Sequence, residues 1–401
     1  MQESKIPKLE RVSENYRDPQ KFESKEGHLR PLFREIQLHK ASDIMILEGQ
    51  PVLVNIQNKL YAATHRNITI SEAQWFLTEL AGKTAISSIN SRKSINTSYS
   101  LFDGAEPTDD EINNNYNRLR NSYRVNVVGT MLRGTPSFQI VLRTIPSQPI
   151  SYKDLGMDED FVLRCCPTSG IVLIAGVTGS GKSTTLASII RYILENWTPI
   201  RGNIITHEEP IEYTFDSIIS EHSIVVQSQI PENFESFYAA NREALRRKPA
   251  GIVVGELRDT ETITSAMEAS LTGHPVFATV HAGSITDIIT RLLAKFEDNK
   301  GAALYDIIST SSMFIAQRLI PDVKGKLFAV REHLYFTEEI KNRIKYLSDP
   351  NDINNVINEI MSNGSNDHKS IASLTFEKQG QILLEQGKID EKGLIWLKGQ
   401  H

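Results

Sequence analysis

Residues 176–185, GVTGSGKSTT, decide the fold of the chain around them. They follow the apolar run IVLIA at 171–175, which predicts a buried strand. After them, apolar residues recur on one face of a predicted helix: Leu186, Ile189, Ile190, Ile193 and Leu194. A tight turn between such a strand and helix points successive backbone N–H groups into one concavity, which suits phosphate oxygens.

This turn matches the phosphate-loop pattern G-x-x-x-x-G-K-[ST]. We expect Lys182 to reach the terminal phosphates of a nucleoside triphosphate and Ser183 to ligate Mg²⁺. An ordinary glycine-rich turn is the alternative, and the flanking strand and helix patterns argue against it. The expected cofactors are therefore ATP and Mg²⁺, bound by Gly176, Val177, Thr178, Gly179, Ser180, Gly181, Lys182, Ser183 and Thr184.

Composition limits the class of protein. The chain has 401 residues, 40% of them hydrophobic and 23% charged, with a net charge of -5. A basic face is not evident, which argues against direct binding of nucleic acid. The adjacent Cys165 and Cys166 give no disulfide framework and favour a reducing compartment. No apolar run approaches the roughly twenty residues of a spanning helix, so we expect a cytoplasmic protein.

Periodicity divides the chain. Between 151 and 335, short apolar runs alternate with helical patterns, as in a parallel sheet covered by helices on both faces. Before this segment, alternating strand patterns and two helical patterns, one from Phe33 and one at 69–82, indicate a smaller α+β domain. We predict a flexible arm at 1–34, an α+β domain at 35–146, a linker at 147–150, an α/β domain at 151–335 and a helical region at 336–401.

Local signals refine the smaller domain. TISEAQWFLTELAG (69–82) predicts a helix capped by Ser71, with Gln74 three residues later. The polar stretch at 86–120 reads as a loop or insertion. The segments 123–134 and 136–146 read as a hairpin of two strands.

Acidic residues and histidines follow three predicted strands of the α/β domain. THEEPIEY (206–213) contains Glu208 and Glu209, AGIVVGELRD (250–259) contains Glu256, and LTGHPVFATVHA (271–282) contains His274 and His281. The carboxyl ends of parallel strands meet at the edge where nucleotides bind. Hydrolysis of a triphosphate needs a residue to orient water and an acidic group near Mg²⁺. Zinc is disfavoured, because these histidines lack local ligand spacing.

Together these segments resemble the PilT-like secretion ATPases, the superfamily of type II and type IV secretion and pilus motors. The resemblance covers residues 40 to 335 and includes ASDIMILEGQP (41–51) and QRLIP (317–321). Within the superfamily, the chain is most similar to the Dot/Icm-type ATPases, whose counterparts serve conjugative transfer. The resemblance implies a RecA-like core, a PAS-like N-terminal domain and a helical C-terminal tail.

The resemblance also implies residue roles. Glu256 is expected to polarise the attacking water, and Gly255 stands where other Walker B strands carry aspartate. Glu208 and Glu209 are expected to help hold Mg²⁺ and water, with Glu209 replacing the family's usual aspartate. His281 is expected to sense the γ-phosphate.

The resemblance implies that arginines of the N-terminal domain and linker complete the active site. Arg124 and Arg133 occupy places similar to the domain arginines, and Arg143 resembles a linker arginine, although their spacing does not establish that they converge. A solvated charge on a strand is the alternative for each. Arg258 is expected to pair with a local carboxylate, and Asp259 to cap the helix that follows.

The family implies a homo-hexameric ring that docks on an inner-membrane secretion or conjugation complex, so we expect peripheral association with that membrane. The alternatives are a pilus retraction ATPase and, from another class, a nucleotide-switched binding scaffold with little turnover. A pilus assembly motor is less favoured, because many carry a four-cysteine zinc module and this chain has only two cysteines.

Overall fold

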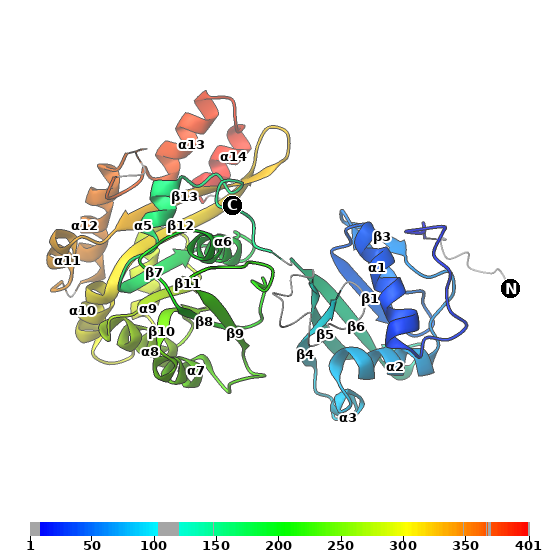
Figure 1. The fold of residues 1–401 in the computed structure, drawn as a ribbon. Coiled ribbons are helices and arrows are strands. Elements are labelled where there is room, and N and C mark those ends of the chain that lie inside the picture. The colour runs from blue at the N-terminus through cyan, green and yellow to red at the C-terminus, as the bar shows by residue number, and fades with distance from the viewer. Residues whose placement is uncertain are drawn as a thin grey trace. The chain divides into compact units, whose positions relative to one another are not determined.

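The computed structural model describes residues 9–102, 120–146, 148–347, 349–365, 367 and 370–399. The chain divides into two compact units, residues 1–148 with 210–217 and residues 149–209 with 218–401 (Figure 1). The boundary between positions 148 and 149 falls within the predicted linker. Each unit has its own sheet and its own hydrophobic core.

Unit 1 is built on a six-stranded antiparallel sheet with the order β3-β2-β1-β6-β5-β4. Its strands are β1 (Asp43–Leu47), β2 (Leu53–Ile56), β3 (Lys59–Ala62), β4 (Ile95–Phe102), β5 (Arg120–Leu132) and β6 (Thr135–Ile145). Its helices are η1 (Lys25–Leu29), α1 (Arg30–Leu38), α2 (Ile70–Ala81) and α3 (Ala85–Asn90).

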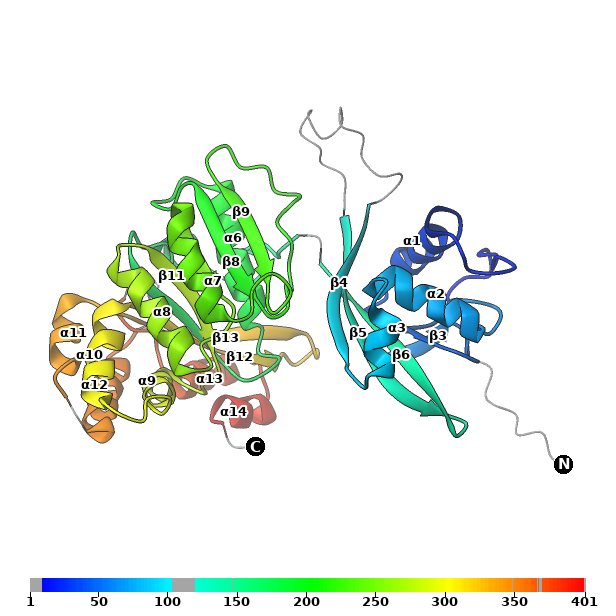
Figure 2. The same cartoon turned by 90° about the horizontal axis from the view of Figure 1, so that it is seen from below.

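The helices of unit 1 cover one face of its sheet (Figure 2). On β5 and β6, alternate residues such as Val125, Val127 and Leu142 are fully buried in the core beneath them. The residues between these, including Arg124 and Arg143, point to the opposite face because side chains alternate along a strand. The predicted hairpin is therefore present, and its two arginines of interest share the face away from the helices.

Three predictions for unit 1 need correction. Residues 9–34, predicted as part of a flexible arm, belong to the domain, because Phe22 is fully buried against Phe76 with ring centroids 5.1 Å apart. The cap of α2 is Thr69 with Glu72, which form a capping box, and not Ser71 with Gln74. The predicted loop at 86–120 contains most of α3 and all of β4, while its residues 103–119 lie outside the described ones.

Unit 2 contains a seven-stranded sheet with the order β13-β12-β7-β11-β10-β8-β9. Its strands are β7 (Gly170–Ala175), β8 (Asn203–Glu208), β9 (Ile224–Gln229), β10 (Pro249–Val254), β11 (Pro275–Val280), β12 (Ser311–Pro321) and β13 (Leu327–Tyr335). All neighbours pair in parallel except β12 and β13, which form an antiparallel hairpin. The carboxyl ends of β7, β11, β10 and β8 therefore meet along one edge.

Helices surround this sheet and continue beyond it. They are α5 (Glu159–Arg164), α6 (Lys182–Glu195), α7 (Phe237–Ala244), η2 (Leu245–Arg247), α8 (Thr260–Leu271), α9 (Ile285–Leu293), α10 (Lys300–Thr310), α11 (Glu338–Ile344), α12 (Pro350–Ser362), α13 (Phe376–Glu385) and α14 (Glu391–Leu397). The predicted α/β class with a helical C-terminal part is confirmed. In the part of the chain that the structure describes, no helix combines the length and apolarity needed to cross a membrane.

Candidate active site

The loop from β7 to α6 adopts a conformation that requires its glycines. Gly179 and Gly181 have φ values of +79° and +83°, in the left-handed region that favours glycine. A Cβ atom on Gly176 would lie 2.6 Å from the carbonyl oxygen of Gln317, and one on Gly181 would lie 3.0 Å from its Nε2. Crowding at Gly176, backbone geometry at Gly179, and both at Gly181 disfavour larger residues at these three positions.

The first turn of α6 is suited to an anion. Its N-cap is Gly181, which offers no side chain to cap the helix. The first N–H groups of a helix have no intrahelical acceptor, and the helix dipole favours negative charge there. Lys182 is held over the loop, because its Nζ donates to the carbonyl oxygens of Gly176 at 2.8 Å and Val177 at 3.1 Å. Ser183, the expected Mg²⁺ ligand, lies in this same turn. These residues fit the triphosphate of a nucleotide with its metal ion.

Two of the predicted catalytic residues lie side by side at the carboxyl edge of the sheet. His281, directly after β11, places its Nε2 3.5 Å from Oε1 of Glu256, which follows β10. Both side chains are partly exposed, at 44% and 38% of their surface, so a ligand or water can reach them. The pairing brings an acid and a titratable ring together at strand ends that are adjacent in the sheet.

The acidic segment after β8 separates into two environments. Glu208 is held by its own sheet, because its Oε1 accepts hydrogen bonds from Thr206 Oγ1 at 2.7 Å and Gln227 Nε2 at 2.9 Å. Glu209 instead forms an ion pair of 2.6 Å with Arg258. Arg258 thus has the local carboxylate partner that the sequence predicted. Glu208 is therefore held in one orientation, whereas Glu209 must leave Arg258 before it can bind a metal ion.

Gly255 explains why this strand end carries no aspartate. Its N–H donates to the carbonyl oxygen of His207 at 2.8 Å, which draws the ends of β10 and β8 together. A Cβ at this position would lie 3.2 Å from that oxygen and 3.3 Å from the Cα of Glu208. Any side chain here would crowd the acidic segment.

His207 is a residue whose place in the site the sequence did not reveal. It is fully buried, and burial lowers the pKa of its ring to about 4, so the ring is neutral at pH 7. Its Nδ1 lies 2.8 Å from Oδ1 of Asn241, whose Nδ2 donates to Ser265 Oγ at 2.9 Å. This chain ties the residue before Glu208 to α7 and α8. A histidine within a buried strand was the available signal.

Other predicted residues have local roles. Asp259 caps α8, as predicted, by accepting a hydrogen bond from Thr262 N at 2.8 Å. His274 lies in the turn before β11, where its Nδ1 is 3.3 Å from the carbonyl oxygen of Ala269.

The three predicted arginines do not form one group. In unit 1, Arg124 of β5 lies directly opposite Arg143 of β6. Arg133 lies in the turn of this hairpin, where it has a φ of +49°. At the rise of a strand, nine residues separate it from Arg124 by about 30 Å. Only Arg124 and Arg143 can act on one small ligand.

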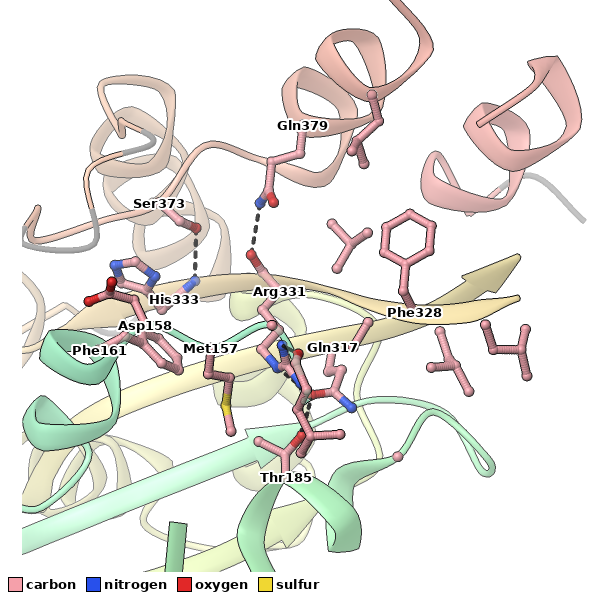
Figure 3. A pocket seen from close by; sticks show the side chains of 18 of the residues that line it. Met157, Asp158, Phe161, Thr185, Gln317, Phe328, Arg331, His333, Ser373 and Gln379 are labelled. Atoms are coloured by element: carbon pink, nitrogen blue, oxygen red, sulfur yellow. Dashed lines mark hydrogen bonds between the residues drawn. The ribbon is translucent and has the colours of Figure 1, made fainter. Parts of the chain in front are cut away.

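A cavity of about 620 Å³ opens beside the start of α6 (Figure 3). Gly181, Thr184 and Thr185 form the wall nearest the phosphate loop. The other walls come from the segment 150–161, the β12–β13 hairpin and α13. Its position next to the loop, with apolar residues such as Met157 and Phe328, suits a nucleobase and ribose.

A family model described as "Type II/IV secretion system protein" matches residues 20–375. The chain belongs to this family. Among curated relatives, it is 39% identical over 206 residues to the type IV pilus retraction ATPase PilT of Pseudomonas aeruginosa, covering 51% of this chain and 58% of PilT. It is 34% identical over 270 residues to a twitching motility protein of Neisseria gonorrhoeae, covering 67% of each. The sequence match thus spans little more than half of the length of the Pseudomonas aeruginosa PilT.

Solved structures of related ATPases match along most or all of the chain. The ATPase DotB of Yersinia pseudotuberculosis is 36% identical with a TM-score of 0.76, and the match covers 100% of both chains. DotB of Legionella pneumophila is 31% identical with a TM-score of 0.81, covering 98% of this chain and 100% of DotB. The pilus retraction motor PilT with bound ADP is 27% identical with a TM-score of 0.75, covering 92% of this chain and 96% of PilT. The predicted RecA-like fold and the closeness to Dot-type secretion ATPases are confirmed.

Proposed function

We propose that this member of the secretion ATPase family binds ATP with Mg²⁺ at the loop between β7 and α6 and hydrolyses it. The observation that carries the proposal is the glycine-lined turn at the uncapped start of α6, with Lys182 held over it. The cavity beside this turn would receive the base and ribose. The identity of 39% with a pilus retraction ATPase supports the same reaction.

Glu256 is the residue we assign to the attacking water. It follows β10 at the edge of the sheet where the loop lies, and its partial exposure leaves room for water. His281, 3.5 Å away, is placed to respond to the γ-phosphate and to pass that response to Glu256. Lys182 would compensate the charge on the terminal phosphates.

The Ser183 hydroxyl and the acidic segment at Glu208 and Glu209 would hold Mg²⁺. The ion would neutralise charge on the phosphate oxygens. Glu208 is kept at the strand end by Thr206 and Gln227, whereas Glu209 would have to exchange its contact with Arg258. We therefore propose that the Glu208 side chain stays in place when Mg²⁺ binds and that the Glu209 side chain moves.

We further propose that Arg124 and Arg143 stabilise charge on the transferred phosphate within a homo-hexameric ring. Like charges directly opposite on neighbouring strands are unfavourable, so an anion between them would be stabilising. Arg133 was predicted for the same role. Its place in the hairpin turn instead suits a contact between subunits.

The work coupled to hydrolysis is, in this proposal, transport by a Dot/Icm-like type IV secretion or conjugative apparatus at the inner membrane. The end-to-end match to two DotB structures supports it. Pilus retraction is the second candidate, supported by the matches to PilT and to a twitching motility protein. In both cases the ring would work on the cytoplasmic side.

Phosphate release by the purified protein tests the enzymatic proposal. The parent chain should release phosphate in the presence of ATP and Mg²⁺, and Glu256→Gln should bind ATP but release little. Equal and negligible release by both, with ATP binding intact, would instead support a binding scaffold. In the native host, a strain carrying Lys182→Ala should lose secretion or conjugative transfer. Loss of twitching motility with transfer intact would favour pilus retraction.

A further inference from the structure

No carboxylate of the described residues balances the charge of Arg331. This arginine projects from β13 into the wall of the cavity beside the phosphate loop (Figure 3). Its guanidinium donates to three neutral oxygens: Gln317 Oε1 at 2.8 Å, the Leu155 carbonyl at 3.0 Å and Thr185 Oγ1 at 3.3 Å. Across the residues that the structure covers, it makes no ion pair, and burial lowers its pKa to about 10. A partly desolvated cation without a counter-ion costs stability, so its position calls for a reason.

Arg331 is needed at this position because it fixes the orientation of the Gln317 amide. The Gln317 side chain is almost fully buried on β12, next to the end of β7. Its Oε1 accepts from both Arg331 Nε and Thr185 Oγ1, the latter at 2.6 Å. Two donors on one end of the amide leave Nε2 as the end that faces the phosphate loop.

The Nε2 end of the Gln317 amide holds the phosphate loop in place. Gln317 Nε2 donates to the carbonyl oxygen of Ser180 at 2.6 Å, at the position just before Gly181. Because the Ser180 carbonyl is held toward β12, the N–H of the next residue, Gly181, points the opposite way, since the C=O and N–H of one peptide are trans across its planar bond. The backbone of the same Gln317 limits the space at Gly176. Gln317 thus fixes the direction of the Gly181 N–H through its side chain and restricts position 176 through its backbone.

We propose that Arg331 and Gln317 are positioning residues for the phosphate loop, with Arg331 acting through Gln317. This inference rests on the proposed binding of ATP at that loop. Neither side chain needs to touch a phosphate. Their hydrogen bonds lead to the loop, so most of their effect should fall on the part of the binding energy that comes from the phosphates. Both side chains also line the cavity assigned to the base and ribose, where their contribution should be smaller.

The test compares Arg331→Met, Gln317→Met and the double variant in the full-length protein. The dissociation constant for ATP and the inhibition constant of adenosine, which has no phosphate, are measured alongside the Tm without nucleotide. Each single variant should weaken ATP binding about tenfold, the effect of losing one well-placed hydrogen bond in a buried network. Adenosine, whose base and ribose would occupy the cavity that both side chains line, should lose clearly less affinity than ATP. Arg331→Met should keep its Tm, since it removes an unbalanced charge.

The double variant decides whether Arg331 acts through Gln317. It should bind ATP no more weakly than Gln317→Met alone, since groups in one network are not additive. A loss of about a hundredfold would overturn the proposal by showing independent effects, and an unchanged affinity in both single variants would also overturn it. Equal weakening of ATP and adenosine together with a lower Tm would show a merely structural role.

Two further variants complete the design. Arg164→Met removes another guanidinium that donates to a backbone carbonyl, that of Ser370, outside the cavity, and should leave ATP binding unchanged. If Arg331→Met does not fold, Arg331→Lys keeps the charge and should weaken ATP binding by an intermediate factor. An affinity equal to that of the parent in the lysine variant would then overturn the proposal. If the parent protein itself does not bind ATP, the proposed function fails rather than this inference alone.

Discussion

Arg143 lies directly opposite Arg124 on neighbouring strands, and its Nε donates to Oδ1 of Asp43 on the next strand at 2.9 Å. Asp43 therefore braces one arginine of the pair. Among the residues described by the structure, Arg124 has no such carboxylate partner. The row across the sheet combines a fixed cation and a free one on the face away from the helices.

This arrangement predicts a ranking of arginine variants. Arg124→Ala and Arg143→Ala should each lower kcat about a hundredfold or more, as arginines do when they stabilise a transferred phosphate. Arg133→Ala, at the distant turn, should affect assembly more than kcat. Steady-state phosphate release at saturating ATP, with ring formation followed by light scattering, makes the comparison.

A mixing experiment separates action between subunits from action within one. The experiment mixes Arg143→Ala chains with Glu256→Gln chains. If Arg143 acts on the nucleotide of the neighbouring subunit, some interfaces in the mixed rings combine a native Arg143 from one chain with a native Glu256 from the other. Such mixtures should regain activity that neither variant has alone. A mixture no more active than the sum of its parts would contradict action across the interface.

Gly255→Ala should damage the site through packing. The added Cβ would meet the His207 carbonyl oxygen at 3.2 Å and the Cα of Glu208 at 3.3 Å, so the ends of β10 and β8 must separate. We expect a loss of about 1–3 kcal/mol in the free energy of unfolding. We also expect a lower kcat, because Glu256 is the next residue. Denaturant unfolding and phosphate release measure the two effects.

Gly301→Ala is the matched control. A Cβ there would meet nothing within 4 Å, and Gly301 lies in α10. Alanine in a helix is favoured over glycine by about 0.5–1 kcal/mol, so this variant should be slightly more stable with normal activity. Equal stability losses at both glycines would show that crowding at position 255 is not the cause.

His207 predicts how stability depends on pH. Burial lowers its folded pKa to about 4 from an ordinary 6.5, so the unfolded chain binds more protons between these values. Its contribution to stability is therefore complete above pH 6.5 and is lost as the pH falls toward 4. A shift of this size corresponds to roughly 3 kcal/mol. His207→Gln, which can still bond to Asn241, should flatten the fall in unfolding free energy between pH 6.5 and 4.5. An unchanged slope would mean that other groups cause it.

The strand–turn–helix structure around the loop at 176–185 could be predicted because its signals are local. A buried strand, a glycine-rich turn and a helix follow one another within 25 residues, at 171–195, so spacing alone defines the loop. The same holds for Glu256 and His281, whose positions at strand ends follow from the parallel order. Their mutual contact depends on β10 and β11 being neighbours, which the sequence does not state.

The features that the sequence did not predict depend on pairing between segments that are distant in the chain. Gln317 approaches Ser180 only because β12 lies next to β7, and Arg124 meets Arg143 only because of the hairpin register. The prediction of a flexible arm at residues 9–34 was wrong because these residues are densely charged. The burial of Phe22 depends on its contact with Phe76 of α2, which local sequence does not reveal. Long-range partners, rather than local propensity, fix these features.

The contacts of Arg318 indicate how the C-terminal helices α13 and α14 are attached to the sheet of unit 2. This arginine donates to the Leu397 carbonyl at the end of α14 and to the Gly283 carbonyl, two residues after His281, at 2.9 Å. Its guanidinium also lies 4.3 Å from the ring centre of Phe376, at the start of α13. Arg318→Met should therefore speed hydrogen exchange of the α14 amides about tenfold or more, because the local opening of that helix becomes easier. Lys398→Met breaks only an exposed ion pair with Glu377, and such pairs contribute about 0–1 kcal/mol, so its exchange should change little. Equal protection of α14 in Arg318→Met and the parent would show that apolar packing alone holds the helix.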